Sequence, residues 1–175
     1  EDADGIRGTE SDDVGVTGLF GTLTSFAPLC VNGQALALDP ATTVTADGEP
    51  VSADRLRVGQ VLWVTGSVVD GVLRAERVDV LIAQRGSIAA VEPRRRRIRV
   101  GEPWVTLLDH ALVVDRATGL HLDPRGLRVG EVVEVSALRD REGRLFASRV
   151  DRIAASREQG SVVRPGHLPE VRALA

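Results

Sequence analysis

The sequence lacks three residue types altogether, and each absence narrows the classes of function. Its 175 residues include no Met, no Tyr and no Lys, a single Cys, and only 3% aromatic residues. Without Lys, neither a catalytic lysine nor a phosphate-binding loop of the Walker type can form. The few aromatic residues argue against a stacking platform for single-stranded nucleic acid. One Cys cannot form an internal disulfide, and no hydrophobic run approaches the roughly 20 residues that span a bilayer.

The composition is nevertheless that of a chain that can build a core. Hydrophobic residues make up 43% and charged residues 27%, with a formal net charge of −3, which is typical of a globular protein. The sequence begins with an acidic, Gly-containing stretch and no Met, as an exported chain does after its signal peptide is removed. We therefore expect export to the periplasm, the cell surface or the medium. Removal of a tag or omission of the initiator would give the same start.

Two segments of the chain carry the same short motifs in the same order, which predicts a duplicated unit. The offset between matching residues is 65 from Gly21 to Gly86, 68 from Gly33 to Gly101, 71 from Leu56 to Leu127 and 72 from Gly71 to Gly143. The offset only grows, and each step falls in a turn-like stretch, as expected if small loop insertions followed a duplication.

Within each unit the pattern indicates β structure. Runs rich in β-branched residues are separated by turn pairs such as Asn32-Gly33 and Asp70-Gly71. The apolar residues of the last strand change parity after Ala75, and again after Ala147, which predicts a bulge at the same place in both units. Closed small barrels need such a bend. One helical turn is expected at 52–56 and another at 123–127.

These features predict an all-β protein of two tandem small OB-like barrels, each with five or six strands, followed by an extra C-terminal strand. An SH3-like barrel or a small sandwich remains an alternative. The expected boundaries are an acidic tail over 1–17, a first barrel over 18–83, a second over 84–155, and an extra strand with its tail over 156–175. The extra strand echoes Gly86 and its neighbours and comprises Gly160, Ser161, Val162 and Val163.

The motifs also resemble a known family. Gly-Thr-Leu-Thr-x-Phe at 21–26, Cys-Val-Asn-Gly at 30–33, Leu-x-Val-Gly-x-x-Leu-x-Val-x-Gly at 56–66 and Gly-x-Leu-x-Ala at 71–75 are similar in order to the bacterial family known as domain of unknown function 5666. The resemblance covers about residues 5–154. It implies an exported protein with tandem small β-domains, and it implies no activity.

One basic cluster is a candidate binding site for an anionic polymer such as nucleic acid, an oligosaccharide or lipopolysaccharide. The candidate residues are Arg94, Arg95, Arg96, Arg97 and Arg99, on a predicted hairpin tip. The simpler interpretation is a solvated tip whose charges keep a strand edge from aggregating. A third is that the tip binds the acidic tail of a neighbouring copy, formed by Glu1, Asp2, Asp4, Glu10, Asp12 and Asp13.

The remaining reactive or aromatic residues favour structural roles. His110, His121 and His167 are the only histidines, and their spacing matches no metal motif, so we predict no metal site and no cofactor. Cys30 is expected to be a small core residue. Trp63 and Trp104 are expected to fill the cores, with a sugar-stacking face as the alternative.

The sequence therefore predicts a non-enzymatic, exported structural or interaction module. Its expected partners are other copies of the chain or another surface protein. Self-assembly into an oligomer or filament would proceed by addition of the strand from Gly160 to Val163 to a sheet edge. The alternative function is an OB-like binding module for an anionic polymer, which would bind through the arginine tip.

Overall fold

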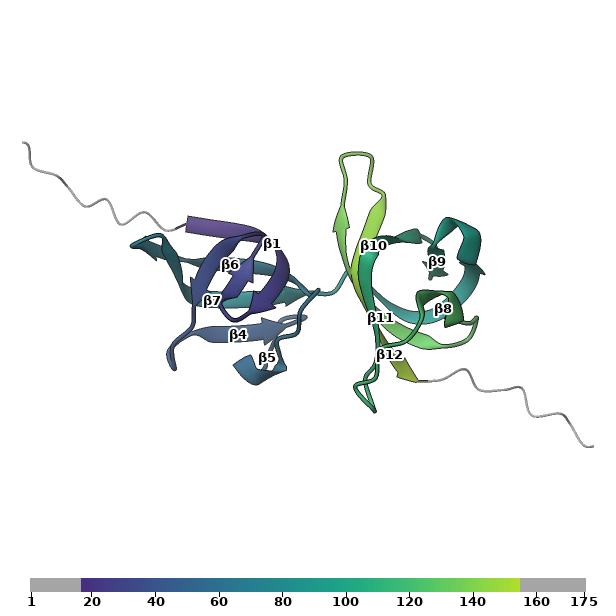
Figure 1. Cartoon of the computed structure of the whole chain (residues 1–175), viewed down its shortest axis with the longest axis horizontal. Coiled ribbons are helices and arrows are strands. Elements are labelled where there is room, and N and C mark those ends of the chain that lie inside the picture. The colour runs from purple at the N-terminus through teal and green to yellow at the C-terminus, as the bar shows by residue number, and fades with distance from the viewer. Residues whose placement is uncertain (1–16, 155–175) are drawn as a thin grey trace, which may run out of the picture.

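The computed structural model describes residues 17–154, which form two β units joined by a short connection (Figure 1). The all-β prediction is confirmed, and the two sheets agree with the predicted tandem arrangement. The described residues contain no α-helix, and none of their helical turns is long and apolar enough to cross a membrane. Residues 1–16 of the predicted acidic tail and all of the predicted C-terminal segment 156–175, with the strand that begins at Gly160, lie outside the described residues, whereas Thr17 begins β1.

The first unit is a mixed sheet of seven strands in the order β3-β2-β1-β6-β7-β4-β5, with a further pairing between β3 and β7. Its strands are β1 (Thr17–Phe26), β2 (Leu29–Val31), β3 (Gln34–Ala37), β4 (Thr43–Ala46), β5 (Glu49–Pro50), β6 (Val61–Val69) and β7 (Val72–Leu81). Both β3 and β4 run parallel to β7, whereas the other pairings are antiparallel.

The second unit is a mixed sheet of five strands whose pairings run β10-β12-β11-β8-β9 and return from β9 to β10. Its strands are β8 (Gln84–Glu92), β9 (Arg97–Val100), β10 (Trp104–Asp115), β11 (Val132–Arg139) and β12 (Leu145–Ala154). Only the pairing of β10 with β12 is parallel.

The predicted bulge is present at the same place in both units. The register of β6 against β7 shifts so that Glu76 has no partner, and that of β11 against β12 shifts so that Ser148 has none. Gly66 lies at the first bulge, where a Cβ would come within 1.9 Å of the Arg74 carbonyl oxygen. Each bulge bends its strand and shifts its inward positions by one, so that residues on both sides of the bulge reach the core.

Turn chemistry places the connections where the sequence predicts them. Asn32-Gly33 and Asp70-Gly71 both have positive φ at both residues, which is the conformation of a tight hairpin turn between twisted strands. The expected helical turns are the short 3₁₀ helices η1 (Ala53–Arg55) and η3 (Pro124–Gly126). A third, η2 (Pro93–Arg95), forms the tip between β8 and β9.

Each unit has its own hydrophobic core. In the first unit the largest fully buried side chains include Leu23, Leu62 and Leu73, and in the second they include Ile88 and Ile98. Burial of apolar surface contributes about 25 cal/mol per Å², but a unit of this size is near the limit at which one core suffices. Contact between the two units is therefore expected to contribute to their stability.

Candidate functional site

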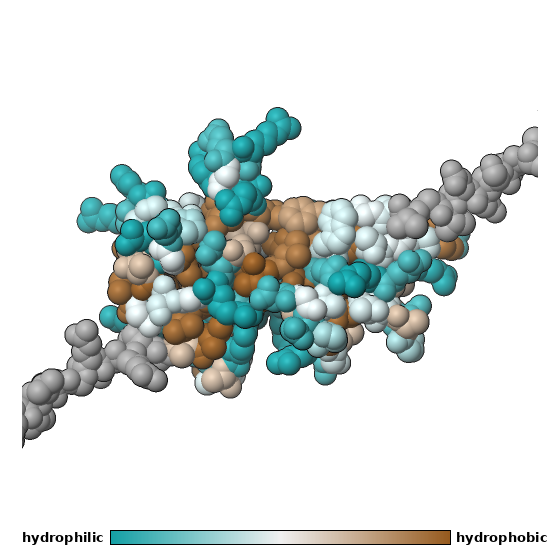
Figure 2. All heavy atoms as spheres, turned by 180° about the vertical axis from the view of Figure 1, so that it is seen from behind, coloured by the Kyte–Doolittle hydropathy of each residue, from teal (hydrophilic) through white to brown (hydrophobic). Residues whose placement is uncertain are grey.

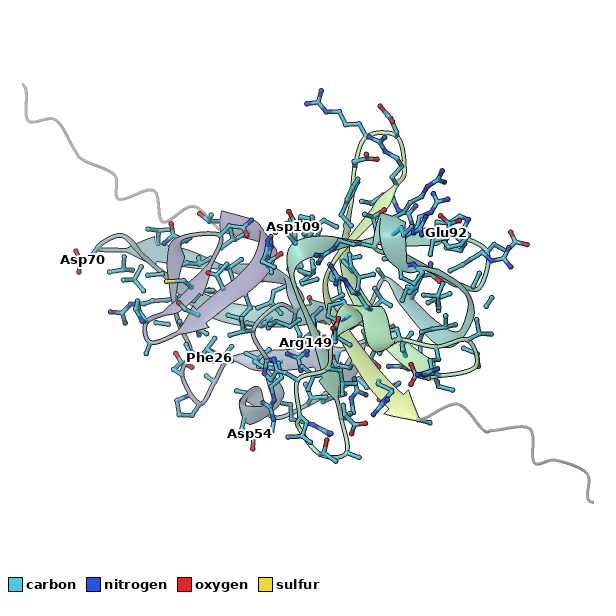
Figure 3. The ribbon with its side chains drawn as sticks, turned by 45° about the vertical axis from the view of Figure 1, so that its right-hand side comes forward. Phe26, Asp54, Asp70, Glu92, Asp109 and Arg149 are labelled. Atoms are coloured by element: carbon cyan, nitrogen blue, oxygen red, sulfur yellow. The ribbon has the colours of Figure 1, made fainter. Side chains whose placement is uncertain are left out.

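The two units meet where a turn of the first lies against the outer face of β11 and β12. We call this contact the seam. Residues 56–59 between η1 and β6 form the seam turn. The seam face consists of Glu134 and Ser136 on β11 and of Ser148, Arg149 and Asp151 on β12. Figure 3 shows Arg149 at this junction.

Two side chains of the seam face bind the backbone of the seam turn. The hydroxyl of Ser148 donates to the carbonyl oxygen of Gly59 at 2.6 Å, and Nη1 of Arg149 donates to the carbonyl oxygen of Val58 at 2.9 Å. Nε and Nη2 of the same guanidinium donate to the Asp151 carboxylate, with distances between 2.8 and 3.1 Å. One arginine therefore connects the two units and neutralises the aspartate beside it.

Gly59 allows the seam turn to approach this closely. Its φ is +91°, which favours glycine, and a Cβ there would lie 3.0 Å from Cβ of Arg149 and 3.1 Å from the Ser148 carbonyl oxygen. A side chain would therefore both strain the turn and push it away from β12.

The seam face is polar but buried, which is unusual for the outer face of a small sheet. Ser136, Ser148, Arg149 and Asp151 are each at most 7% exposed, and Glu134 is 9% exposed. Buried charges of this kind must be paired and hydrogen-bonded, because unpaired they cost several kcal/mol. The pairing therefore fixes the geometry of the seam.

A second group of charges continues the seam. Glu134 accepts from Nη2 of Arg116 at 2.7 Å and from Nε and Nη2 of Arg85 at 2.9 and 2.6 Å. Burial would raise the pKa of the Glu134 carboxyl, but the two arginines outweigh this effect and hold the pKa below its usual value. Arg85 also lies 3.6 Å from the Asp47 carboxylate of the first unit, a weak contact because both side chains are more than half exposed.

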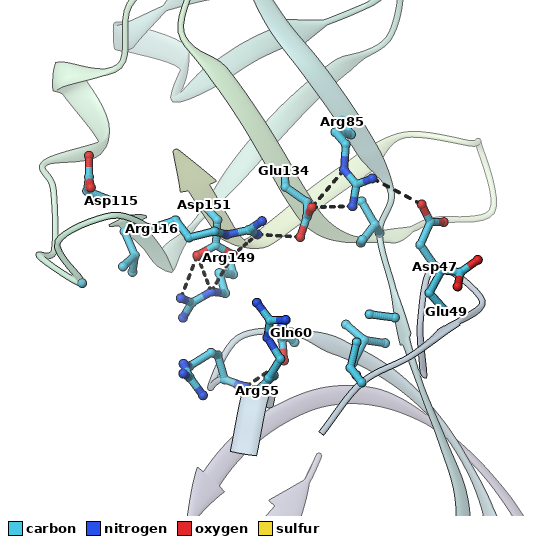
Figure 4. A pocket seen from close by; sticks show the side chains of 17 residues that line it. Asp47, Glu49, Arg55, Gln60, Arg85, Asp115, Arg116, Glu134, Arg149 and Asp151 are labelled. Atoms are coloured by element: carbon cyan, nitrogen blue, oxygen red, sulfur yellow. Dashed lines mark hydrogen bonds and ion pairs between the residues drawn. The ribbon is translucent and has the colours of Figure 1, made fainter. Parts of the chain in front are cut away.

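Beside the seam lies a cleft of about 490 Å³ between the two units. Figure 4 shows Arg55 and Gln60 of the first unit facing Arg116, Arg149 and Asp151 of the second across it. Its charged lining consists of Arg55, Arg57, Arg85, Arg116 and Arg149 with Asp47, Glu49, Asp115, Glu134 and Asp151. The five arginines and five acidic residues of this lining balance in formal charge.

Comparison with known families agrees with this paired architecture. The family described as domain of unknown function (DUF5666) matches residues 21–79 and again residues 85–151. The chain belongs to this family. Each DUF5666 segment begins in the first strand of one unit and ends in its last strand. No curated protein and no solved structure matches the chain.

The predicted anion-binding arginines lie at one tip of the second DUF5666 segment, and several are already bound. Arg97 donates to both carboxylate oxygens of Glu92 at 2.8 and 3.0 Å and lies 4.5 Å above the Trp104 ring. Arg96 donates to the Leu108 carbonyl oxygen at 2.8 Å.

The rest of this arginine cluster is less engaged. Arg94 and Arg95 are exposed, and Arg95 lies 3.6 Å from Glu92. Arg99 is half-buried, with its guanidinium 5.9 Å from the Trp104 ring. Among residues 17–154 neither Arg94 nor Arg99 forms an ion pair. Anion binding at this tip stays a prediction, carried mainly by Arg94, Arg95 and Arg99.

Two expectations about core residues in the first DUF5666 segment are wrong, and both errors come from strand parity. Trp63 is 42% exposed because its neighbours Leu62 and Val64 face the core. Cys30 is half-buried rather than a core residue because Val31, next to it on β2, takes the inward position.

In the second DUF5666 segment the corresponding expectation for Trp104 is also corrected. Val105 faces the core, so Trp104 lies half-buried on the outer face beneath Arg97. His110 and His121 are exposed, and within residues 17–154 no three His, Cys, Asp or Glu side chains are grouped so that they could hold a metal. His167 lies outside the described residues.

No sequence motif predicts the seam residues Ser148, Arg149 and Asp151 as a site. One signal was present, because Glu134 occupies an outward position on β11 where the matching position of the first unit holds Trp63. Because one unit has a carboxylate where the other has a tryptophan, the surroundings of this position must differ between the units. The substitution does not tell which residues surround it.

Proposed function

We propose that the chain is a non-enzymatic, exported structural or interaction module, built of two OB-like barrels that the seam holds in one orientation. The single observation that carries the proposal is the seam itself. A buried arginine that binds both its own aspartate and the other unit's backbone keeps the two units from moving independently. A rigid pair of small barrels can present surfaces at a fixed spacing to a partner.

The strand order supports the OB-like assignment. In the second unit the first, second and third strands are β8, β9 and β10, and the third runs parallel to the fifth, β12. A short helical turn precedes the fourth strand, β11. A five-stranded Greek-key sheet that returns on itself in this way is the OB plan. The first unit repeats the plan, with β3 and β4 sharing the place of one strand beside β7.

The proposed partners are other copies of the chain or another surface protein. Self-association by addition of the strand from Gly160 to Val163 would need an open sheet edge. The open edges within the described residues include two segments of the first unit. One is β5, which is only two residues long and contains Pro50. The other is residues 18–21 of β1, which pair with β6 on one side only.

Sedimentation velocity of the whole chain, compared with a chain that ends at residue 157, tests this proposal. Self-association of the whole chain, or retention of another surface protein, supports an interaction module. A chain that stays monomeric at all concentrations and captures no partner contradicts it. Export is tested separately by locating the chain in fractions of the cell that produces it.

A second candidate function is binding of an anionic polymer through the arginine tip. The charge of the tip favours this function. Among the described residues, the three arginines Arg94, Arg95 and Arg99 have one carboxylate partner between them, Glu92, which lies 3.6 Å from Arg95. Retention on a heparin column that falls after Arg94→Ala and Arg95→Ala, but not after Arg74→Ala on β7, would support it. Equal retention of all three variants would contradict it.

A further inference from the structure

The seam face has a counterpart in the first unit, at the same positions of the strand pairing. In the second unit Arg85 pairs with Glu134 and Glu134 with Asp151, while Ser136 pairs with Arg149. In the first unit the matching pairs are Phe20 with Trp63, Trp63 with Asp79, and Thr65 with Arg77. The unpaired bulge residues are Ser148 and Glu76. We call the surface formed by Trp63, Thr65, Glu76, Arg77 and Asp79 the exposed face.

The ion pair of the seam face is reproduced on the exposed face. Nε of Arg77 donates to the two Asp79 carboxylate oxygens at 3.0 and 2.8 Å, and Nη2 lies 2.8 Å from Oδ1. Nη1 of Arg77, the atom that in Arg149 binds the seam turn, has no hydrogen-bond partner among residues 17–154. The Arg77 side chain is 51% exposed, compared with 8% for Arg149. The exposed face therefore has one of the two donors of the seam face, the arginine, without its acceptor, and in place of the other donor, Ser148, it has Glu76.

The seam turn also has a counterpart, in the second unit. Residues 127–130, between η3 and β11, match residues 56–59, and we call them the exposed turn. Leu127 and Leu56 are both buried, and Gly130 and Gly59 have φ values of +89° and +91°. Val129, however, is 57% exposed and Gly130 is exposed, whereas Gly59 is buried against β12. The exposed turn has the shape of the seam turn, and nothing within residues 17–154 covers it.

We propose that the exposed turn of one copy of the chain docks on the exposed face of another copy, and so repeats the seam between molecules. In this contact Nη1 of Arg77 donates to the Val129 carbonyl oxygen, as Arg149 does to that of Val58. The proposal rests on the self-association proposed above and names the surfaces that carry it. The exposed turn and the exposed face are different surfaces from the strand from Gly160 to Val163, which was proposed above to add to a sheet edge.

The differences between the two faces also favour a second copy as the occupant. Where the seam face has Ser148, the exposed face has Glu76. The exposed turn carries Arg128, and η3 just before it carries Arg125; both arginines are exposed, and neither side chain has an ion pair among residues 17–154. A carboxylate on one surface and two unpaired guanidinium groups on or beside the other make the surfaces complementary in charge, although Glu76 cannot replace the hydrogen bond that Ser148 donates to the turn.

The exposed face is also more apolar than the seam face. Its Trp63 is 42% exposed, and the adjacent Phe20 and Leu81 are 48% and 39% exposed. Phe20 and Trp63 lie with ring centroids 6.4 Å apart. Hydrophobic side chains reach the surface near the junction of the units on the side shown in Figure 2. Burial of such a patch supplies a driving force that the polar seam face lacks.

The docking surfaces lie on different units, so the contact is heterologous. Each copy that docks through its exposed turn still offers its own exposed face, and each new copy adds both. A heterologous contact that does not close into a ring produces an open chain of molecules. The expected assembly is thus a head-to-tail filament in which intramolecular and intermolecular seams alternate.

Sedimentation velocity across a concentration series tests the proposal with one variant on each surface. Val129→Asp introduces a charge at the centre of the exposed turn, and Glu76→Arg reverses the charge of the exposed face. Each variant is expected to weaken self-association about tenfold or more. The matched controls are Val68→Asp, at another exposed valine, and Glu102→Arg, at another exposed glutamate. Circular dichroism confirms that all four variants fold.

The outcomes separate this proposal from the one on which it rests. Loss of association in both surface variants, with both controls and the chain ending at residue 157 unchanged, supports docking of turn on face. Association that survives both surface variants but disappears when residues 158–175 are removed overturns it and leaves strand addition. Wild-type protein that never associates overturns the proposed self-assembly as well.

Discussion

Arg149 and Arg77 offer a direct comparison of the same ion pair in two surroundings. Each donates through Nε and Nη2 to an aspartate two residues further along the last strand of its unit. Replacing either residue by Ala removes the same groups from the same place in the sheet. The difference in the free energy of unfolding therefore measures what the seam adds.

The two substitutions are expected to differ several-fold in cost. The Asp151 side chain is 7% exposed in the native chain, and Arg149→Ala leaves it with Arg116, at 3.8 Å, as its one charged partner among the described residues. The substitution also removes the hydrogen bond to the seam turn. Breaking one side of a buried pair costs about 3–5 kcal/mol. Arg77→Ala removes a pair whose arginine is 51% exposed, and such surface pairs contribute about 0–1 kcal/mol.

Urea unfolding at a concentration where the chain is monomeric measures both values. Each unit has one tryptophan, Trp63 in the first and Trp104 in the second. Trp104→Phe therefore leaves a fluorescence probe for the first unit, and Trp63→Phe leaves one for the second. The two probes should report one transition in the otherwise native chain and two separate transitions after Arg149→Ala. The role of the seam would be refuted if Arg149→Ala and Arg77→Ala lowered the free energy of unfolding equally. It would also be refuted if the two probes still reported one transition after Arg149→Ala.

Three further predictions concern the seam and the bulge. Gly59→Ala and Gly130→Ala both place Ala at positive φ, which lowers the free energy of unfolding by about 1 kcal/mol or more. Gly59→Ala should cost about 2 kcal/mol beyond that, because it also breaks seam hydrogen bonds, and equal costs in urea unfolding would contradict this. Gly66→Ala should prevent native folding, since its Cβ would lie 1.9 Å from the Arg74 carbonyl oxygen, and a native circular dichroism spectrum would contradict this. The folded-state pKa of Glu134 is below its unfolded value, so the stability it contributes is present above the unfolded pKa and lost as pH falls through the folded value. Stability should therefore decline below about pH 4, and less steeply in Glu134→Gln. An unchanged slope would contradict the pairing.

Much of the fold follows from local patterns in the sequence. The repeated offsets place both units, and the parity change after Ala75 and Ala147 locates the two bulges that the pairing shows. Asn32-Gly33 marks a hairpin because Asn and Gly tolerate the positive φ that the turn requires. These features depend on residues close together in the chain, so one sequence is sufficient to find them.

The seam could not be predicted in the same way. Arg77 and Arg149 lie in the same motif with the same aspartate, and no local pattern tells which of the two is buried. Burial depends on the other unit, whose contact at Val58 is 91 residues away from Arg149. The outward orientation of Trp63 was not predicted because a large apolar side chain is expected in a core. The alternation of the strand shows the opposite, since Leu62 and Val64 on either side of Trp63 take the inward positions.

The most direct test of repeated docking is to mix two variants that each lack one surface. Val129→Asp retains the exposed face, and Glu76→Arg retains the exposed turn. If the turn of one copy docks on the face of another, neither variant should assemble alone at the lowest concentration where the wild type assembles. At that concentration an equimolar mixture should form a dimer and nothing larger in sedimentation velocity. A mixture that remains monomeric while the wild type assembles, or variants that assemble alone, would contradict the account.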